Sequence, residues 1–144
     1  MPKRPYISAS IKKKVAKRAN ALCEYCKCPK KYAPGPFDIE HTIPLSKGGS
    51  SLLDNLAYAC NGCNGIKYNK IYAIDPADGK SVRLYNPRKN DWSDHFMWSD
   101  TGLLVIGITS IGRATVNLLE LNREELLNIR SILHLIGEHP PNDS

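Results

Sequence analysis

CEYC at residues 23–26 and CNGC at residues 60–63 are two cysteine pairs with the same two-residue spacing. A turn with this spacing directs both sulfur atoms toward one point, and two such turns can complete a tetrahedral zinc site. The sequence therefore predicts one structural Zn²⁺ bound by four thiolates, those of Cys23, Cys26, Cys60 and Cys63. Because a four-thiolate site leaves no coordination position open, it would stabilise the fold and take no part in catalysis.

Cys28 is the fifth cysteine and forms a C-x-C pair with Cys26. It could compete for the metal, but the two-residue spacing of the second pair favours Cys23 with Cys26. An odd number of cysteines is typical of a metal site with one spare thiol in a reducing compartment, not of a disulfide framework. We therefore expect a cytoplasmic protein. Neither a signal peptide nor a membrane-spanning segment is expected, because no apolar stretch has the required pattern or length.

Positive charge is concentrated in the first half of the chain. Residues 1–70 contain 13 Lys and Arg against 4 Asp and Glu, a net charge of +9, whereas residues 71–144 contain 7 against 10, a net charge of −3. Basic side chains displace counterions from phosphates, so a polyanion-binding surface is expected in the first half. Simple solvation of the same side chains is the other interpretation of a basic run.

Local patterns predict the elements around the cysteines. A basic amphipathic helix is expected over about residues 11–20, with Ser10 as its N-cap. Residues 37–41 alternate apolar and polar side chains as a short strand does, and residues 52–60 should turn and return as a second strand. Residues 61–70 can then form a short helix.

The second half has fewer marked patterns. Strands are expected at residues 82–85 and 102–109. Trp92 and Trp98 belong to an aromatic cluster that is more typical of a core than of a base-stacking surface, because single-strand binding surfaces pair aromatic rings with positive charge. His95, in the same cluster, is expected to be structural.

The last element predicted is a helix near the C-terminus. Asn122 is the expected N-cap, and Glu125 stands three residues later as in a capping box. Gly137 should end the helix, shortly before a proline.

Three segments carry a resemblance to a known family: DIEHTIPLSKGG at residues 38–49, DNL at residues 54–56 and CNGCNGIK at residues 60–67. In order and spacing they resemble the HNH nucleases, whose ββα-metal motif cleaves phosphodiester bonds. The resemblance spans about residues 8–70. Glu40 stands where the family usually has Asp, and Asn64 stands in place of the second histidine. Parts of residues 85–116, together with HPP at residues 139–141, also resemble the C-terminal extension of stand-alone bacterial HNH proteins, which adds no activity of its own.

The resemblance implies a role for each polar residue of the motif. His41 would be the general base, since a neutral imidazole can accept a proton from water near neutral pH. Glu40 and Asn64 offer oxygen ligands that suit Mg²⁺ or Mn²⁺, and such an ion would stabilise the leaving oxygen. Asn55 would hydrogen-bond across the loop and hold the backbone that presents His41.

These features together predict an α+β fold with two parts: a ββα-metal (His-Me finger) nuclease module stapled by zinc over residues 1–70, and a small mixed α/β extension over residues 71–144 that packs on it. The predicted function is metal-dependent endonucleolytic cleavage of DNA, most simply duplex DNA, with RNA as an open alternative and with the protein as a monomer or weak homodimer. The candidate phosphate contacts are Arg18, Lys47, Lys67 and Lys70.

Two other functions are compatible with the cysteine pairs. A zinc ribbon that binds DNA or RNA without cleaving it is the main alternative, but such a ribbon has no need of Glu40, His41 and Asn64. An iron-binding, rubredoxin-like module is a more distant alternative, and its red colour would distinguish it from a colourless zinc protein.

Overall fold

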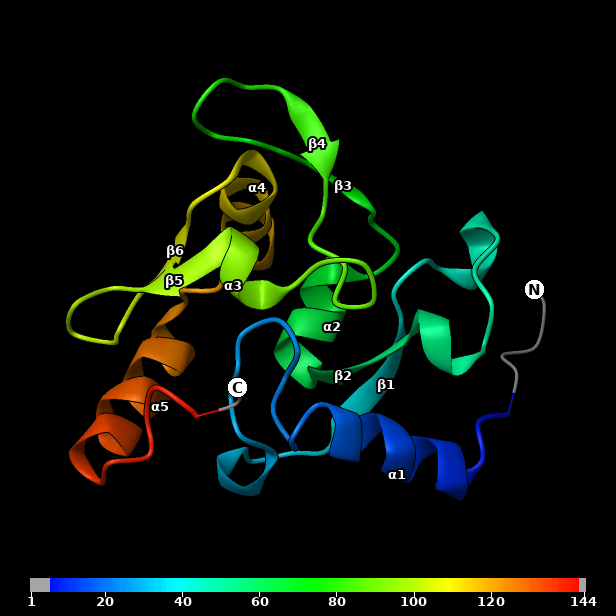
Figure 1. The fold of residues 1–144 in the computed structure, drawn as a ribbon, viewed down its shortest axis with the longest axis horizontal. Coiled ribbons are helices and arrows are strands. Elements are labelled where there is room, and N and C mark those ends of the chain that lie inside the picture. The colour runs from blue at the N-terminus through cyan, green and yellow to red at the C-terminus, as the bar shows by residue number, and fades with distance from the viewer. Residues whose placement is uncertain (1–5, 143–144) are drawn as a thin grey trace.

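The computed structural model describes residues 6–142 and has the predicted α+β architecture (Figure 1). In chain order its helices and strands are α1 (Ala9–Arg18), β1 (Phe37–His41), β2 (Leu56–Cys60), α2 (Asn61–Lys67), β3 (Tyr72–Ile74), β4 (Ser81–Arg83), α3 (Trp92–His95), β5 (Phe96–Trp98), β6 (Val105–Gly107), α4 (Ser110–Leu119) and α5 (Glu124–Leu135), with short 3₁₀ turns at Lys30–Tyr32, Leu45–Lys47 and Leu53–Asn55. Within residues 6–142, no helix has the length and apolar character needed to cross a bilayer.

The strands β1 and β2 pair antiparallel, and α2 follows β2 without a linker, which gives a ββα unit. The register pairs Phe37 with Cys60 and His41 with Leu56. The predicted order of strand, loop, strand and helix is confirmed. The helix ends at Lys67, earlier than predicted, because Tyr68 adopts a positive φ of 49° that cannot continue an α-helix.

The helices α1 and α2 flank the β1–β2 hairpin (Figure 1). Val15 of α1 packs with Leu56 and Tyr58 of β2 in a small core of its own. The helix begins two residues before its predicted start because Ser8, not Ser10, is the N-cap: Ser8 Oγ accepts the N–H of Ile11 at 3.2 Å.

The C-terminal half consists of two hairpins, β3–β4 and β5–β6, and the helices α4 and α5. The helix α4 was not predicted, because its sequence SIGRATVNLL contains a glycine and several β-branched residues, which lower helix propensity. Thr109 caps it by accepting the N–H of Gly112. A side chain at Gly112 would lie 2.0 Å from the His95 carbonyl oxygen, so this glycine permits the close approach of α4 to the end of α3.

The start of α5 differs from the prediction. Arg123 occupies the N-cap position, and its side chain makes no capping hydrogen bond. The Asn122 side chain binds β6 instead, accepting from Val105 N at 2.8 Å and donating to Val105 O at 3.0 Å. The prediction for the other end holds, since Gly137 has a positive φ of 76° directly after the helix C-cap.

The main hydrophobic core extends across residue 70. Its buried members from the first half are Cys23, Tyr25, Cys26, Ala59, Cys60 and Cys63, and those from the second half are Tyr85, Phe96, Val105, Leu119, Leu121 and Leu126. Trp92 and Trp98 pack against this core, as predicted, with ring centroids 5.3 Å apart. The two halves of the chain therefore bury apolar surface against each other.

Candidate active site and zinc site

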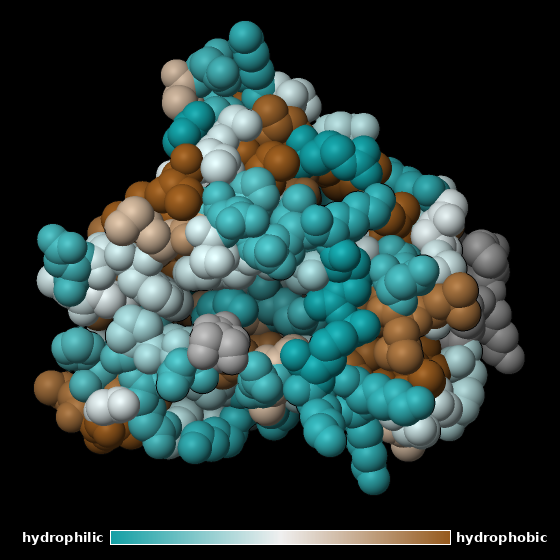
Figure 2. Space-filling model, in the orientation of Figure 1, coloured by the Kyte–Doolittle hydropathy of each residue, from teal (hydrophilic) through white to brown (hydrophobic). Residues whose placement is uncertain are grey.

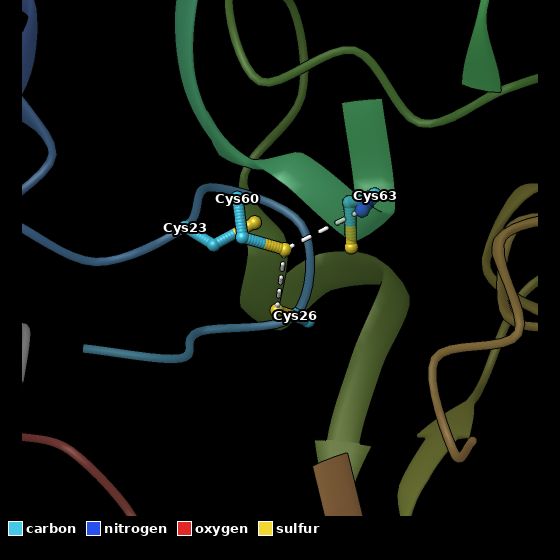
Figure 3. Close-up of side chains that lie close together, drawn as sticks. All are labelled: Cys23, Cys26, Cys60 and Cys63. Atoms are coloured by element: carbon cyan, nitrogen blue, oxygen red, sulfur yellow. Dashed lines mark hydrogen bonds between the residues drawn. The ribbon is translucent and has the colours of Figure 1, made fainter. Parts of the chain in front are cut away.

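The two cysteine pairs come together as predicted (Figure 3). Four Sγ atoms lie within 4.8 Å of one another, those of Cys23, Cys26, Cys60 and Cys63. Cys26 Sγ and Cys60 Sγ are 3.7 Å apart. Tetrahedral zinc with Zn–S bonds of about 2.3 Å requires sulfur atoms roughly 3.8 Å apart. The four thiols therefore form a site whose geometry fits structural Zn²⁺.

Cys28 does not belong to this cluster. Its sulfur donates to the carbonyl oxygen of Pro29 at 3.7 Å. Burial raises the pKa of the Cys28 thiol to about 11, so this cysteine stays protonated at neutral pH. The prediction that Cys28 is the spare thiol is confirmed.

Local hydrogen bonds shape each cysteine pair. In the first, Cys23 N donates to Cys28 O and Lys27 N donates to Cys23 O, both at 2.9 Å, which closes a tight turn. In the second, Cys60 ends β2 and caps α2, and its sulfur accepts the N–H of Cys63 at 3.4 Å. The junction between β2 and α2 therefore positions two of the four sulfur atoms.

Glu40 lies in a buried polar cluster on β1. The Tyr25 hydroxyl, between the first two cysteines, donates to Glu40 Oε1 at 2.5 Å. The Lys67 ammonium of α2 lies 3.3 Å from Glu40 Oε2 and donates to the carbonyl oxygen of Thr42 at 3.1 Å. Glu40 and Lys67 are each 2 % exposed. Burial raises the pKa of the Glu40 carboxyl, whereas Lys67 and then Tyr25 act to lower it.

The Asn64 side chain contacts Asp38, which lies on the same strand two residues before Glu40. Its Nδ2 donates to Asp38 Oδ2 at 3.0 Å. Asp38 and Glu40 point to the same face of β1 because side chains alternate along a strand. The ββα unit thus brings two carboxylates and the Asn64 amide to one face, the face covered by α2.

This donor set suits a hard divalent cation. Carboxylate and amide oxygens are the ligands that Mg²⁺ and Mn²⁺ prefer. Glu40 Oε2 is buried, and the cation beside it in this structure is the Lys67 ammonium at 3.3 Å. Glu40 and Asn64 therefore fit such an ion by their chemistry, with Lys67 as the group that the ion would displace.

His41 follows Glu40 at the end of β1 and is 6 % exposed. Its Nε2 lies 2.9 Å from Ser51 Oγ, in the loop that connects β1 to β2. Asn55 spans the same loop: its Oδ1 accepts from Thr42 Oγ1 and Ile43 N, and its Nδ2 donates to the carbonyl oxygens of Ile43 and Ser50. Both the oxygen and the nitrogen of the Asn55 amide are therefore hydrogen-bonded within the loop that follows His41.

Two of the candidate phosphate contacts are exposed lysines. Lys70 faces solvent just beyond α2, and exposed Lys47 donates to the carbonyl oxygen of Asn69 at 2.8 Å. The helix α1 adds further exposed basic residues, and Figure 2 shows a hydrophilic surface over it. These residues are Lys12, Lys13, Lys14 and Lys17.

The other two candidates are engaged within the protein. Arg18 donates to the carbonyl oxygens of Leu53 at 3.0 Å and Leu56 at 2.6 Å, so its guanidinium holds α1 to the start of β2. The expectation for Lys67 is corrected, because its buried ammonium is bound to Glu40 and Thr42 and does not face solvent.

Residues 23–70 match the family model described as HNH endonuclease. This segment is an HNH domain. The match includes both cysteine pairs, β1, β2 and α2, and it implies nuclease-type activity on nucleic acid. No curated protein and no solved structure matches the chain.

Sequence reasoning missed three residues at these sites. Tyr25 contacts Glu40 from within the first cysteine pair of the HNH domain, and nothing in CEYC indicates this contact. Asp38 had a usable signal, since it stands two residues before Glu40 in a predicted strand. Arg123, which contacts Cys60 and Cys63, lies far away in the sequence and had none.

Proposed function

We propose that this protein is an endonuclease that uses a divalent metal ion to hydrolyse phosphodiester bonds in DNA. The observation that carries the proposal is the ββα arrangement, in which β1 ends in Glu40-His41 and α2 brings Asn64 against the same strand. Burying a carboxylate is costly. A ribbon that only binds nucleic acid gains nothing from one, so this arrangement favours the nuclease over the zinc-ribbon alternative.

His41 is the general base in this proposal. Its imidazole accepts the proton of the attacking water, a role for which histidine is the side chain most often used. The contact with Ser51 orients the ring. Asn55 holds the loop on both sides of this contact and is a positioning residue.

Glu40 and Asn64 hold the divalent ion, Mg²⁺ or Mn²⁺. When bound, such an ion stabilises the negative charge that develops on the leaving oxygen. The hydrogen bond from Tyr25 occupies Glu40 Oε1 and leaves Oε2 as the ligand atom. Without the ion, the Lys67 ammonium of α2 balances the charge of the same carboxylate.

The basic surface of the first half binds the substrate. Lys47, Lys70 and the lysines of α1 are exposed and can contact phosphates without reading sequence. Duplex DNA is the proposed substrate, in a cytoplasm where the zinc thiolates stay reduced.

The test is cleavage of supercoiled plasmid in Mg²⁺ or Mn²⁺ by the wild-type protein and by His41→Ala. Removal of a positioned base should lower the rate roughly 10²- to 10⁴-fold while DNA affinity and zinc content stay unchanged. His134→Ala is the matched control, because His134 is an exposed histidine of α5 and should leave the rate unchanged. Asn64→Ala should regain part of its activity at raised Mn²⁺, and His41→Ala should not.

Two results would contradict the proposal. A His41→Ala variant that cleaves at the wild-type rate would remove the role given to this residue. A wild-type protein that binds duplex DNA but cleaves neither DNA nor RNA with any divalent ion would favour the zinc-ribbon alternative.

A further inference from the structure

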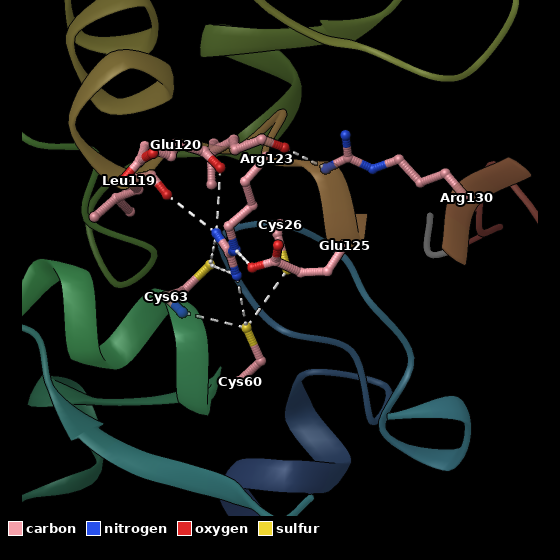
Figure 4. A network of polar contacts seen from close by, with 9 residues as sticks. Cys26, Cys60, Cys63, Leu119, Glu120, Arg123, Glu125 and Arg130 are labelled. Atoms are coloured by element: carbon pink, nitrogen blue, oxygen red, sulfur yellow. Dashed lines mark hydrogen bonds and ion pairs between the residues drawn. The ribbon is translucent and has the colours of Figure 1, made fainter. Parts of the chain in front are cut away.

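Arg123 connects the C-terminal half of the chain to the cysteine cluster (Figure 4). Its Nη1 lies 3.6 Å from Cys63 Sγ, and its Nη2 lies 3.6 Å from both Cys60 Sγ and Cys63 Sγ. Nη1 also donates to the carbonyl oxygens of Leu119 and Glu120, at the end of α4. One guanidinium therefore links the last turn of α4 to two of the four candidate zinc ligands.

The charge of the zinc site explains why a guanidinium belongs there. Four thiolates and one Zn²⁺ carry a formal excess of two negative charges, and Cys23, Cys26 and Cys63 are at most 1 % exposed. Negative charge buried to this degree is costly unless N–H donors or cations balance it. Arginine supplies both, because its planar fork carries several N–H groups and a permanent positive charge.

The second cysteine pair is shaped to admit this side chain. A Cβ at Gly62 would lie 2.6 Å from Arg123 Nη2, so any larger residue at position 62 would push the guanidinium away. The Arg123 side chain is 10 % exposed, which limits competition from water for its N–H groups. The exposed Glu125 carboxylate accepts the Arg123 Nε–H at 2.9 Å, and this N–H is not one of those that face the sulfur atoms.

We infer that Arg123 is an outer-sphere positioning residue of the zinc site, which donates N–H···S hydrogen bonds to Cys60 and Cys63 and slows the loss of zinc. The zinc site of the HNH domain is then completed by a residue outside the matched segment, from the α4–α5 turn. The inference concerns metal retention and holds whether or not the domain cleaves DNA.

The test is the rate of zinc transfer from the full-length protein to a chromophoric chelator under native conditions. Loss of outer-shell partners typically weakens metal binding about 10- to 100-fold, so Arg123→Ala should release zinc faster by a factor in that range. Arg123→Lys keeps the charge but loses the fork and should fall between Arg123→Ala and the wild type. Gly62→Ala, which displaces the guanidinium from the other side, should also speed release.

A second measurement separates this role from support of the α4–α5 turn. In Co²⁺-substituted protein, the sulfur-to-cobalt charge-transfer band responds to hydrogen bonds at sulfur. Arg123→Ala and Arg123→Lys should shift this band, whereas Glu125→Ala, which removes only the acceptor of the Nε hydrogen bond, should leave both the band and the release rate unchanged. Wild-type release rates and an unshifted band in Arg123→Lys would overturn the inference, even if Arg123→Ala fails to fold.

Discussion

In the proposed metal site, Asp38 determines which atom of Asn64 would bind the cation. Because Asn64 Nδ2 donates to Asp38 Oδ2 at 3.0 Å, the amide oxygen of Asn64 is the atom left for ligation. A freely rotating amide would present nitrogen as often as oxygen, and nitrogen does not ligate Mg²⁺ or Mn²⁺. In the proposed site, this hydrogen bond would orient the amide before an ion binds.

Asp38→Ala is expected to weaken Mn²⁺ binding to the HNH domain. A hydrogen bond of this kind contributes about 1–2 kcal/mol, which corresponds to a roughly 5- to 30-fold weaker affinity in calorimetric titration. Asp38→Asn is the matched variant, since its side-chain oxygen still accepts from Asn64, and it should bind Mn²⁺ nearly as well as the wild type. An Asp38→Asn affinity as low as that of Asp38→Ala would mean that the charge of Asp38 acts on the ion directly.

At the scale of elements, the junction of β2 and α2 is expected to depend on zinc. Cys60→Ser removes a ligand at the residue that both ends the strand and caps the helix. The binding free energy of a structural zinc is largely folding free energy, on the order of 10 kcal/mol, so this variant should lose zinc on dialysis and unfold in a broad, low-temperature transition. Cys28→Ser should retain zinc and the wild-type melting curve. Elemental analysis and circular dichroism would check both, and zinc loss by Cys28→Ser alone would reverse the assignment.

The elements differ in how far their sequence predicts them. β1, β2 and α2 followed from alternation and from the cysteine spacing, because both signals lie within a few residues. The start of α5 did not, since Asn122 has a good N-cap sequence but a better partner in the backbone of Val105, which only the folded chain brings near. The helix α4 was missed for a similar reason: its weak propensity is outweighed by the burial of Ala114, Thr115 and Leu119.

At the scale of the whole molecule, the uneven charge of the two halves suggested a division near residue 70, but packing ties them together. Arg88 forms an ion pair with Glu24 in the first cysteine pair, and Trp92 Nε1 donates to Tyr25 O at 3.0 Å. Such contacts join residues more than sixty positions apart. Composition and local periodicity carry no information about pairings of this range, so the expected packing of the second half on the first could not be assigned to particular residues.

The shared core predicts that the chain unfolds in a single transition. The two tryptophans, Trp92 and Trp98, both lie in the second half, whereas all four candidate zinc ligands lie in the first. Tryptophan fluorescence and zinc release to a chelator therefore report on different halves of the same molecule. In a urea titration the two signals should change at the same midpoint, because coincident transitions are the mark of one cooperative unit.

Phe96→Ala should lower the unfolding free energy by about 3–5 kcal/mol, since Phe96 is 2 % exposed in the shared core. Both midpoints should therefore move together to a lower urea concentration. A fluorescence midpoint that moves in Phe96→Ala while zinc release stays in place would show two independent domains.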